Sequence, residues 1–421
     1  MTALTPPMGW NSWDCYGASV NEQTVRANAE FMAKNLKQYG WEYIVVDIQW
    51  YEPTADSHEY HPFTELCMDE YSRLIPAENR FPSSAGGKGF APLAEYVHSL
   101  GLKFGIHIMR GIPRQAVHRN TAIKGTDKTA RQIAKTASIC AWNTDMYGVD
   151  PAKEGAREYY DSLFELYASW GVDFIKIDDI CRELPHEESE LIMVSEALHA
   201  CGRDMVLSLS PGPALPEKAE LYKQFANMWR ITDDFWDKWE LLYDMFRRAE
   251  TWCVHAGAGH WPDCDMLPIG AILQDYGDSG FTKFTHDEQI TMLSLWCMVR
   301  SPLIIGGDIT KTADDFTMSL LTNSELIEIL NHTHSARPLF RRMNGDCENI
   351  AWFTSHENGQ TYYIALFNAG EVPCTVTAEI PLSGEFFCMN VWSGENCGSV
   401  SGSVSAAVNP HGAVIFKLVR K

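Results

Sequence analysis

The chain has 421 residues, of which 45% are hydrophobic and 12% aromatic, and its formal net charge is −21. This length exceeds one ordinary domain but fits a barrel of about 250 residues with a small appended domain. The strong negative charge argues against nucleic-acid binding, which needs clustered Lys and Arg side chains, and it favours a neutral or cationic ligand.

The N-terminal segment has neither a charged n-region nor an apolar h-region, so no signal peptide is visible. No stretch approaches the roughly 18 uninterrupted apolar residues that span a bilayer, so no membrane partner is expected. The 12 cysteines are scattered without a CxxC pair, and we expect them to be mostly reduced and buried. These features predict a cytoplasmic protein. They are also compatible with a homo-oligomer.

Short apolar segments alternate with helix-like segments through the first three quarters of the chain. The helical pattern is clearest over 21–39 and 155–170, each of which stops at a glycine. Continuously apolar strands are typical of a parallel sheet that is covered on both faces. Eight of them, with helices between, predict a (β/α)8 TIM barrel over residues 1–330. The expected strands are 8–11, 43–47, 103–108, 174–178, 205–210, 228–234, 261–266 and 302–305.

The pattern changes after about residue 335. Short β-rich segments at 350–354, 361–367, 374–378 and 413–418 are separated by turn residues and show no helical period. This pattern predicts a C-terminal antiparallel β-sandwich domain, which we assign to residues 331–421.

Two of the barrel strands end in a doublet of aspartates, Asp178-Asp179 and Asp233-Asp234. The carboxyl ends of barrel strands meet on one rim, where the active sites of such barrels are built. Two carboxylates brought together there suit hydrolysis of a glycosidic bond. Lys176 lies two residues before Asp178 and therefore points to the same face, where its charge would keep Asp178 ionised.

Arg230 and Asp234 repeat this arrangement on the second strand. The spacing alone does not separate Asp233 from Asp234 as the general acid, and either could instead be the N-cap of a helix beginning near Trp236. A structural ion pair is the simpler alternative for each strand end.

The segment 260–266 brings His260, Asp263, Cys264 and Asp265 together, which raises the alternative of a metal-dependent barrel hydrolase or isomerase. No ligand spacing of a closed zinc or calcium site is present, so we expect no metal and no other cofactor. Hydrogen bonding of sugar hydroxyls by Asp265 fits better.

Taken in this order, the motifs resemble the retaining α-galactosidase family, glycoside hydrolase family 27 of the melibiase clan. The opening motif is Pro7-Met8-Gly9-Trp10-Asn11-Ser12-Trp13, and the nucleophile strand is Lys176-Ile177-Asp178. The acid/base strand runs from Trp229 to Asp234. The segments Trp261 to Met266 and Ser301 to Asp308 match two further family motifs.

The resemblance implies a barrel followed by a β-domain, with Asp178 as nucleophile and Asp234 as acid/base. It also implies substrate contacts by Trp13, Asp47, Lys176, Arg230 and Asp265. The expected partner is an oligosaccharide or glycoside substrate with a terminal α-D-galactose-configured sugar.

Four departures from the family pattern bear on the substrate or the cysteines. Ile48 stands where family members carry a second Asp near the C6 hydroxyl, which suits β-L-arabinopyranose. Ser210, in the segment 208–214, stands in the region of an expected Glu and resembles members that accept a 2-acetamido sugar. His107 replaces the usual Tyr. Ile180 stands where a disulfide cysteine is expected.

These departures leave α-N-acetylgalactosaminidase and β-L-arabinopyranosidase as alternatives to α-galactosidase. A non-catalytic sugar-binding protein is the remaining alternative from another class.

Overall fold

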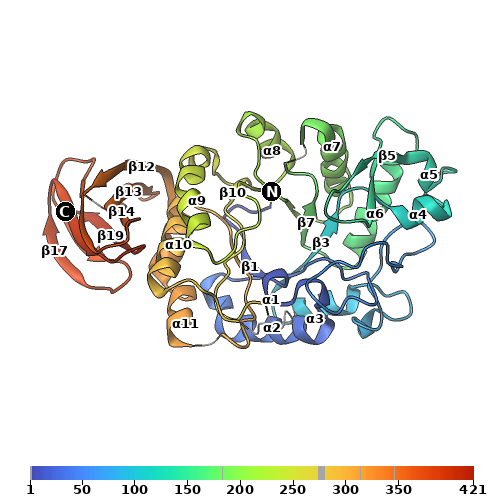
Figure 1. The fold of residues 1–421 in the computed structure, drawn as a ribbon, viewed down its shortest axis with the longest axis horizontal. Coiled ribbons are helices and arrows are strands. Elements are labelled where there is room, and N and C mark those ends of the chain that lie inside the picture. Colours follow the sequence, from blue (N-terminus) through green and yellow to red (C-terminus); the bar gives the residue numbers. More distant parts are fainter. Residues whose placement is uncertain (1, 183, 274–279, 313, 346) are drawn as a thin grey trace.

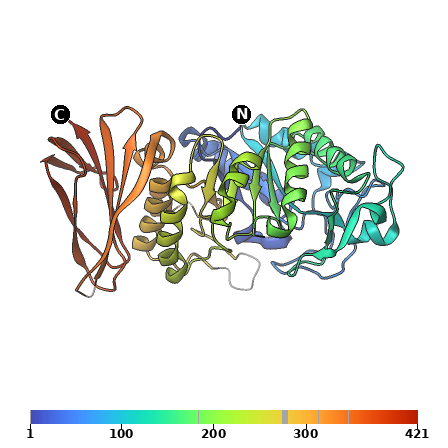
Figure 2. The same ribbon diagram turned by 90° about the horizontal axis from the view of Figure 1, so that it is seen from above.

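The computed structural model describes residues 2–182, 184–273, 280–312, 314–345 and 347–421. The barrel, the insertion beside it and the C-terminal sheets are arranged along the long axis of the molecule (Figure 1; Figure 2).

Eight parallel strands form one sheet in the order β10-β9-β8-β7-β3-β2-β1-β11. Past the end of β10, a parallel bridge between Leu267 and Ile305 of β11 closes the sheet into a barrel. All eight predicted strands are confirmed, although four are shorter than expected at their carboxyl ends. The strands are β1 (Met8–Asn11), β2 (Tyr43–Val46), β3 (Lys103–Met109), β7 (Phe174–Asp178), β8 (Val206–Leu209), β9 (Met228–Arg230), β10 (Trp261–Asp263) and β11 (Leu303–Ile305).

The helices that follow the strands begin and end at the signals in the sequence. The side chain of Asn21 accepts a hydrogen bond from the Thr24 amide and caps α2 (Glu22–Asn35), while Gly40 stops the short turn behind it at a φ of +95°. Helix α6 ends just before Gly171, as the sequence predicts. The other helices are α3 (Ala91–Ser99), α6 (Ala156–Ser169), α7 (Leu184–Ala200), α8 (Ala219–Phe225), α9 (Trp239–Trp252), α10 (His286–Val299), α11 (Asp315–Leu321) and α12 (Ser324–His332), with the single-turn α1 (Trp13–Tyr16) after β1.

An insertion between β3 and β7 was not apparent from the sequence. It holds a three-stranded sheet in the order β4-β6-β5 and two short helices. The insertion lies at the end of the molecule opposite the C-terminal domain in both views (Figure 1; Figure 2). Its elements are β4 (Ile112–Pro113), α4 (Arg114–Arg119), α5 (Ala130–Ile133), β5 (Ala134–Ile139) and β6 (Met146–Val149).

The C-terminal domain is an antiparallel β-sandwich, as predicted. Its larger sheet has the order β12-β13-β14-β19-β16-β17, and β15 pairs with β18 in the smaller one. Trp392 of this domain donates a hydrogen bond to Ser294 of α10, which fixes the domain against the barrel. The strands are β12 (Thr333–Asn344), β13 (Cys347–His356), β14 (Thr361–Asn368), β15 (Cys374–Glu379), β16 (Phe386–Asn390), β17 (Asn396–Val400), β18 (Ser403–Val408) and β19 (Ala413–Arg420).

All twelve cysteines lie in the described ranges and are free thiols, most of them buried. In the described part of the chain, no helix has both the length and the apolar surface that crossing a bilayer requires.

Candidate active site

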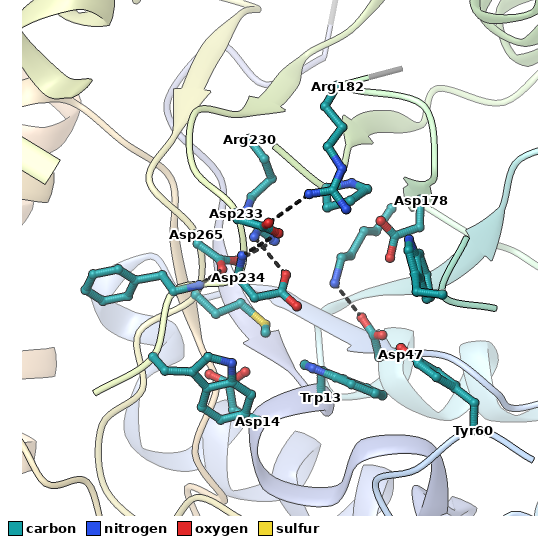
Figure 3. Close-up of a pocket in the computed structure, with 16 residues that line it drawn as sticks. Trp13, Asp14, Asp47, Tyr60, Asp178, Arg182, Arg230, Asp233, Asp234 and Asp265 are labelled. Atoms are coloured by element: carbon teal, nitrogen blue, oxygen red, sulfur yellow. Dashed lines mark hydrogen bonds and ion pairs between the residues drawn. The ribbon is translucent and has the colours of Figure 1, made fainter. Parts of the chain in front are cut away.

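A pocket of about 300 Å³ opens at the carboxyl ends of the barrel strands (Figure 3). This is the rim where barrel enzymes place their catalytic groups, and the volume is at the lower end for a small-molecule site. Its lining residues are Trp13, Asp14, Asp47, Tyr60, Trp142, Lys176, Asp178, Arg182, Pro211, Arg230, Asp233, Asp234, Phe235, Trp236, Asp265 and Met266.

Asp178, the last residue of β7, is nearly enclosed, and its side chain is 12% exposed. His107 Nε2 of β3 lies 2.9 Å from its Oδ2, and the Ser210 hydroxyl donates to its Oδ1 at 2.8 Å. Burial alone would raise the pKa of Asp178, but the hydrogen bond and charge of His107, together with Lys176 and Ser210, outweigh it. The pKa of Asp178 is therefore held well below its usual range, and the group is ionised at neutral pH.

Lys176 and Asp47 form a buried ion pair on the floor of the pocket. The Lys176 ammonium donates to Asp47 Oδ2 at 2.9 Å, and the Asn11 amide donates to the same oxygen at 2.7 Å. Burial opposes both charges, yet Lys176 and His107 lower the pKa of Asp47, and Asp47 and Asp178 raise that of Lys176. Both groups remain charged and present fixed donors and acceptors to a ligand.

On the opposite wall, Arg230 of β9 holds two carboxylates at once. Its Nη2 donates to Asp234 Oδ1 at 3.0 Å, and its Nη1 lies 2.8 Å from Asp265 Oδ1. The guanidinium is buried, whereas the Asp234 side chain is 58% exposed. Figure 3 shows Asp178 and Asp234 on opposite sides of the pocket. Asp234 is thus held in place but stays open to solvent.

Two buried carboxyl groups, those of Asp265 and Asp14, lie next to this wall of the pocket. Burial and the neighbouring Asp234 and Asp263 raise the pKa of Asp265 to about 7, although Arg230 opposes the shift. Burial, reinforced by Asp265, also raises the pKa of Asp14 well above its usual range. The Asp14 Oδ2 atom has no hydrogen-bond partner among the described residues. A protonated Asp14 is the form that this setting favours.

Asp233 and Asp234 differ clearly in the structure. Asp233 points to the rim and accepts a hydrogen bond from Arg182 at 2.8 Å, whereas Asp234 bonds Arg230 inside the pocket. The alternative that either residue caps the next helix is wrong, because α9 begins at Trp239 with Lys238 as its N-cap. The chain continues past β9 as a loop that exposes both side chains.

Aromatic rings form the remaining wall. The Trp13 and Tyr60 rings stack with centroids 5.4 Å apart, and Trp142 contacts Tyr60 at 5.5 Å. The His58 ring lies against Trp13, and its Nε2 is 2.7 Å from the Trp13 carbonyl. Ring faces of this kind suit the C–H surface of a sugar.

Three of the predicted substrate-binding residues do not line the pocket surface. His107 and Ser210 lie behind Asp178 and contact it directly. Ile48 is buried, and its amide donates to Asp47 Oδ1 at 2.9 Å. These three residues therefore lie behind the pocket surface. The other predicted substrate-binding residues line the pocket, namely Trp13, Asp47, Lys176, Arg230 and Asp265.

The segment 260–266 is split between the two ends of β10. His260 precedes the strand, whereas Asp265 follows it and faces Arg230. Among the residues that the structure describes, no three His, Cys, Asp or Glu side chains are placed to hold a metal ion together.

The sequence interpretation missed Asp14, Tyr60, Trp142 and Arg182. Asp14 directly follows the opening motif, and Arg182 lies four residues after Asp178, so their positions in the chain were available signals. Tyr60 comes from the long loop after β2 and Trp142 from the connection between β5 and β6, and only the fold brings them to the pocket.

A parallel eight-stranded barrel with paired carboxylates across one rim pocket defines a glycoside hydrolase of the barrel class. The chain matches the alpha galactosidase A family over residues 5–154 and 151–332, and the alpha galactosidase C-terminal beta sandwich domain over residues 347–418. It therefore belongs to the α-galactosidase family, glycoside hydrolase family 27.

Solved structures and curated relatives agree with this assignment. A family 27 β-L-arabinopyranosidase from Geobacillus stearothermophilus is 54% identical, with a TM-score of 0.95 over 99% of this chain and 97% of that one. A Bacillus halodurans C-125 protein, described as a candidate α-N-acetylgalactosaminidase, is 51% identical, with a TM-score of 0.89 over 100% and 99%. The α-galactosidase of Coffea arabica is 29% identical over 99% of this chain and 94% of its own length.

Proposed function

We propose that this glycoside hydrolase works by double displacement, with Asp178 as nucleophile and Asp234 as general acid/base. The observation that carries the proposal is the contrast between two carboxylates in one pocket. Asp178 is buried and kept ionised, whereas Asp234 is exposed and held by Arg230. A nucleophile must be charged, and an acid/base must exchange protons with water.

In the first step an oxygen of Asp178 attacks the anomeric carbon while Asp234 gives its proton to the departing glycosidic oxygen. A covalent glycosyl–Asp178 ester and a free alcohol result. In the second step Asp234 takes a proton from water, whose oxygen displaces Asp178 from the anomeric carbon. Two inversions retain the configuration of the sugar.

The pocket floor supplies the contacts that position the sugar ring. The Asp47–Lys176 pair offers an acceptor beside a donor, which matches two adjacent hydroxyls. Trp13 offers an aromatic face for the apolar side of the ring, and Arg230 offers donors on the side of Asp234. Charged groups that are already paired need little rearrangement when the sugar binds.

We propose β-L-arabinopyranosides as the preferred substrates. Position 48 is a buried isoleucine whose amide donates to Asp47, so no carboxylate at this position can accept a C6 hydroxyl. The β-L-arabinopyranosyl ring has the galactose configuration but no exocyclic carbon. The 54% identity to a β-L-arabinopyranosidase over nearly the whole chain supports the same choice.

A second candidate is a 2-acetamido sugar. The segment 208–214 brings only Pro211 to the pocket, and no carboxylate of this segment lies among the described lining residues. Ser210 instead turns to Asp178. A wall without an acid could accommodate an acetamido group, and the Bacillus halodurans relative points in the same direction.

Initial rates on the p-nitrophenyl glycosides of β-L-arabinopyranose, α-D-galactose and N-acetyl-α-D-galactosamine test the choice. We expect kcat/KM to be highest for the arabinoside. In Ile48→Asp, the ratio of galactoside to arabinoside kcat/KM should rise by about 10-fold or more, with Ile48→Val as the control. A wild-type preference for either of the other two sugars would contradict the proposed specificity.

A further inference from the structure

A second pocket of about 410 Å³ adjoins the catalytic one. Trp142 and Arg182 line both, so the two spaces share a wall. The other side of the second pocket comes from β5 of the insertion, at Ala137 and Ser138. The β3–β7 insertion therefore extends the binding surface beyond the barrel rim.

The floor of this second pocket is a buried polar network. The guanidinium of Arg110 donates to Asp179 Oδ2 at 2.7 Å, to Glu190 at 3.0 Å and to the Ser138 hydroxyl at 3.0 Å. Asp179 follows Asp178 directly and has a φ of +63°, which is uncommon for a residue other than glycine. Because the chain turns here, Asp178 lines the catalytic pocket and Asp179 lines the second pocket.

Each cation around the second pocket is paired with at least one carboxylate. Lys135 Nζ lies 3.1 Å from Glu187 Oε2, and Arg182 bonds Asp233 at 2.8 Å, while Arg110 is neutralised by its acidic partners. An anionic ligand would have to compete with these carboxylates for the same cations. The surface therefore suits a neutral molecule with many hydroxyls, with the half-buried Trp142 ring available for stacking.

The position of this pocket relative to Asp234 decides its role. Arg182 lines both pockets and bonds Asp233 of the catalytic pocket (Figure 3), and Asp233 is the neighbour of Asp234. In the proposed mechanism Asp234 protonates the departing oxygen, so the leaving group lies on this side. We propose that the second pocket is the subsite for a neutral sugar leaving group, an inference that rests on the proposed function.

The test fills the second pocket without touching the buried network. Ala137 is exposed on β5 and lines it, whereas the neighbouring Thr136 lines a different pocket. Ala137→Trp should lower kcat/KM by about 10-fold or more for a disaccharide that joins the preferred sugar to a neutral hexose. With the glycosyl fluoride of the same sugar, whose leaving group is one atom, it should match the wild type. Thr136→Trp is the matched control and should match the wild type on both substrates.

Equal disaccharide hydrolysis by Ala137→Trp and the wild type would overturn the subsite. If Ala137→Trp does not fold, Lys135→Met decides, because it removes a donor from the same pocket at a half-exposed position. A loss of about threefold or more on the disaccharide alone supports the proposal, and no loss overturns it. A wild-type enzyme that hydrolyses no galacto-configured fluoride would instead contradict the proposed function itself.

Discussion

The two sides of the catalytic pocket give their carboxylates opposite environments. On the β7 side, Asp178 is enclosed and receives hydrogen bonds on both oxygens from His107 and Ser210. On the β9 side, Asp234 is largely exposed and contacts Arg230 through one oxygen. The same residue type thus becomes a fixed charge in one place and a solvent-accessible proton carrier in the other.

The contrast extends to the groups behind each carboxylate. Cationic and hydrogen-bond donor groups gather behind Asp178, namely Lys176, His107 and Ser210. Behind Asp234 lie two buried acids. Asp265 pairs with the guanidinium of Arg230, and Asp14 has an Oδ2 atom without a hydrogen-bond partner among the described residues. The β7 side therefore favours the ionised form of Asp178, whereas burial on the β9 side raises the pKa values of Asp265 and Asp14.

Removal of the proposed nucleophile should have the largest effect. Asp178→Asn keeps the shape of the side chain but cannot form the glycosyl ester, so turnover of all glycosides should fall below detection. Turnover is measured by release of p-nitrophenol, and folding by the melting temperature. Asp179→Asn is the neighbouring control and should still release p-nitrophenol, because Asp179 faces Arg110 and not the catalytic pocket. An active Asp178→Asn enzyme would refute the assignment.

Removal of the proposed acid/base should have a smaller effect that depends on the leaving group. Asp234→Ala should lower kcat/KM for a disaccharide by about 10²–10⁴-fold, the usual contribution of general acid catalysis. The loss should be much smaller with a glycosyl fluoride, whose leaving group needs no proton. Asp233→Ala is the matched control, since Asp233 bonds Arg182 at the rim. If Asp233→Ala instead showed the loss of about 10²–10⁴-fold with the disaccharide and Asp234→Ala did not, the two roles would have to be exchanged.

The sequence predicted all eight barrel strands because their signals are local, and it placed Asp178 and the Asp233-Asp234 doublet at the carboxyl ends of two of them. An apolar β-branched run that stops at an acid, such as Phe174–Asp178, predicts both a buried strand and the placement of its last side chain. The choice of Asp234 over Asp233 came from the family resemblance, since the spacing left it open. The domain boundary at residue 331 stays a prediction.

The parts that were missed depend on contacts between distant segments. In the sequence, Asp14 has no feature that separates it from an ordinary polar residue. It is buried because the chain after β11 packs against it. A Cβ atom on Gly306 would lie 1.9 Å from Asp14 Oδ2. Trp142 belongs to an insertion whose short strands carry no clear alternation, so nothing local placed its ring at the pocket.

The support behind Asp178 can be tested through its hydrogen bonds. His107→Phe keeps a ring in place but removes the Nε2 contact, which should lower kcat/KM by about 10-fold or more, since hydrogen bonds to charged groups contribute about 1.5–3 kcal/mol. The pKa of Asp178 should rise, so the acidic limb of the kcat/KM profile should move to higher pH. Ser210→Ala should shift the limb less, because Ser210 contributes less than His107 to the low pKa. Identical profiles for His107→Phe and the wild type would contradict this account.

The buried acid Asp265 near Asp234 should make the stability of the folded protein depend on pH. Burial raises the pKa of Asp265 from 3.8 to about 7, so between these values the folded protein keeps a proton that the unfolded chain has released. Stability should therefore fall as the pH rises from about 4 to about 7, because the native state binds more protons there. Asp265→Asn removes this titration, so its melting temperature should decline less over that range, by a few degrees relative to the wild type.

The exposed Asp127, which pairs with Lys128 and accepts a hydrogen bond from the Thr126 hydroxyl, provides the control. Asp127→Asn should keep the wild-type dependence of melting temperature on pH. An equally steep decline in Asp265→Asn would mean that the carboxyl is already ionised at low pH. The β9 side would then hold its charges as the β7 side does, and the contrast between the two walls would rest on the exposure of Asp234 alone.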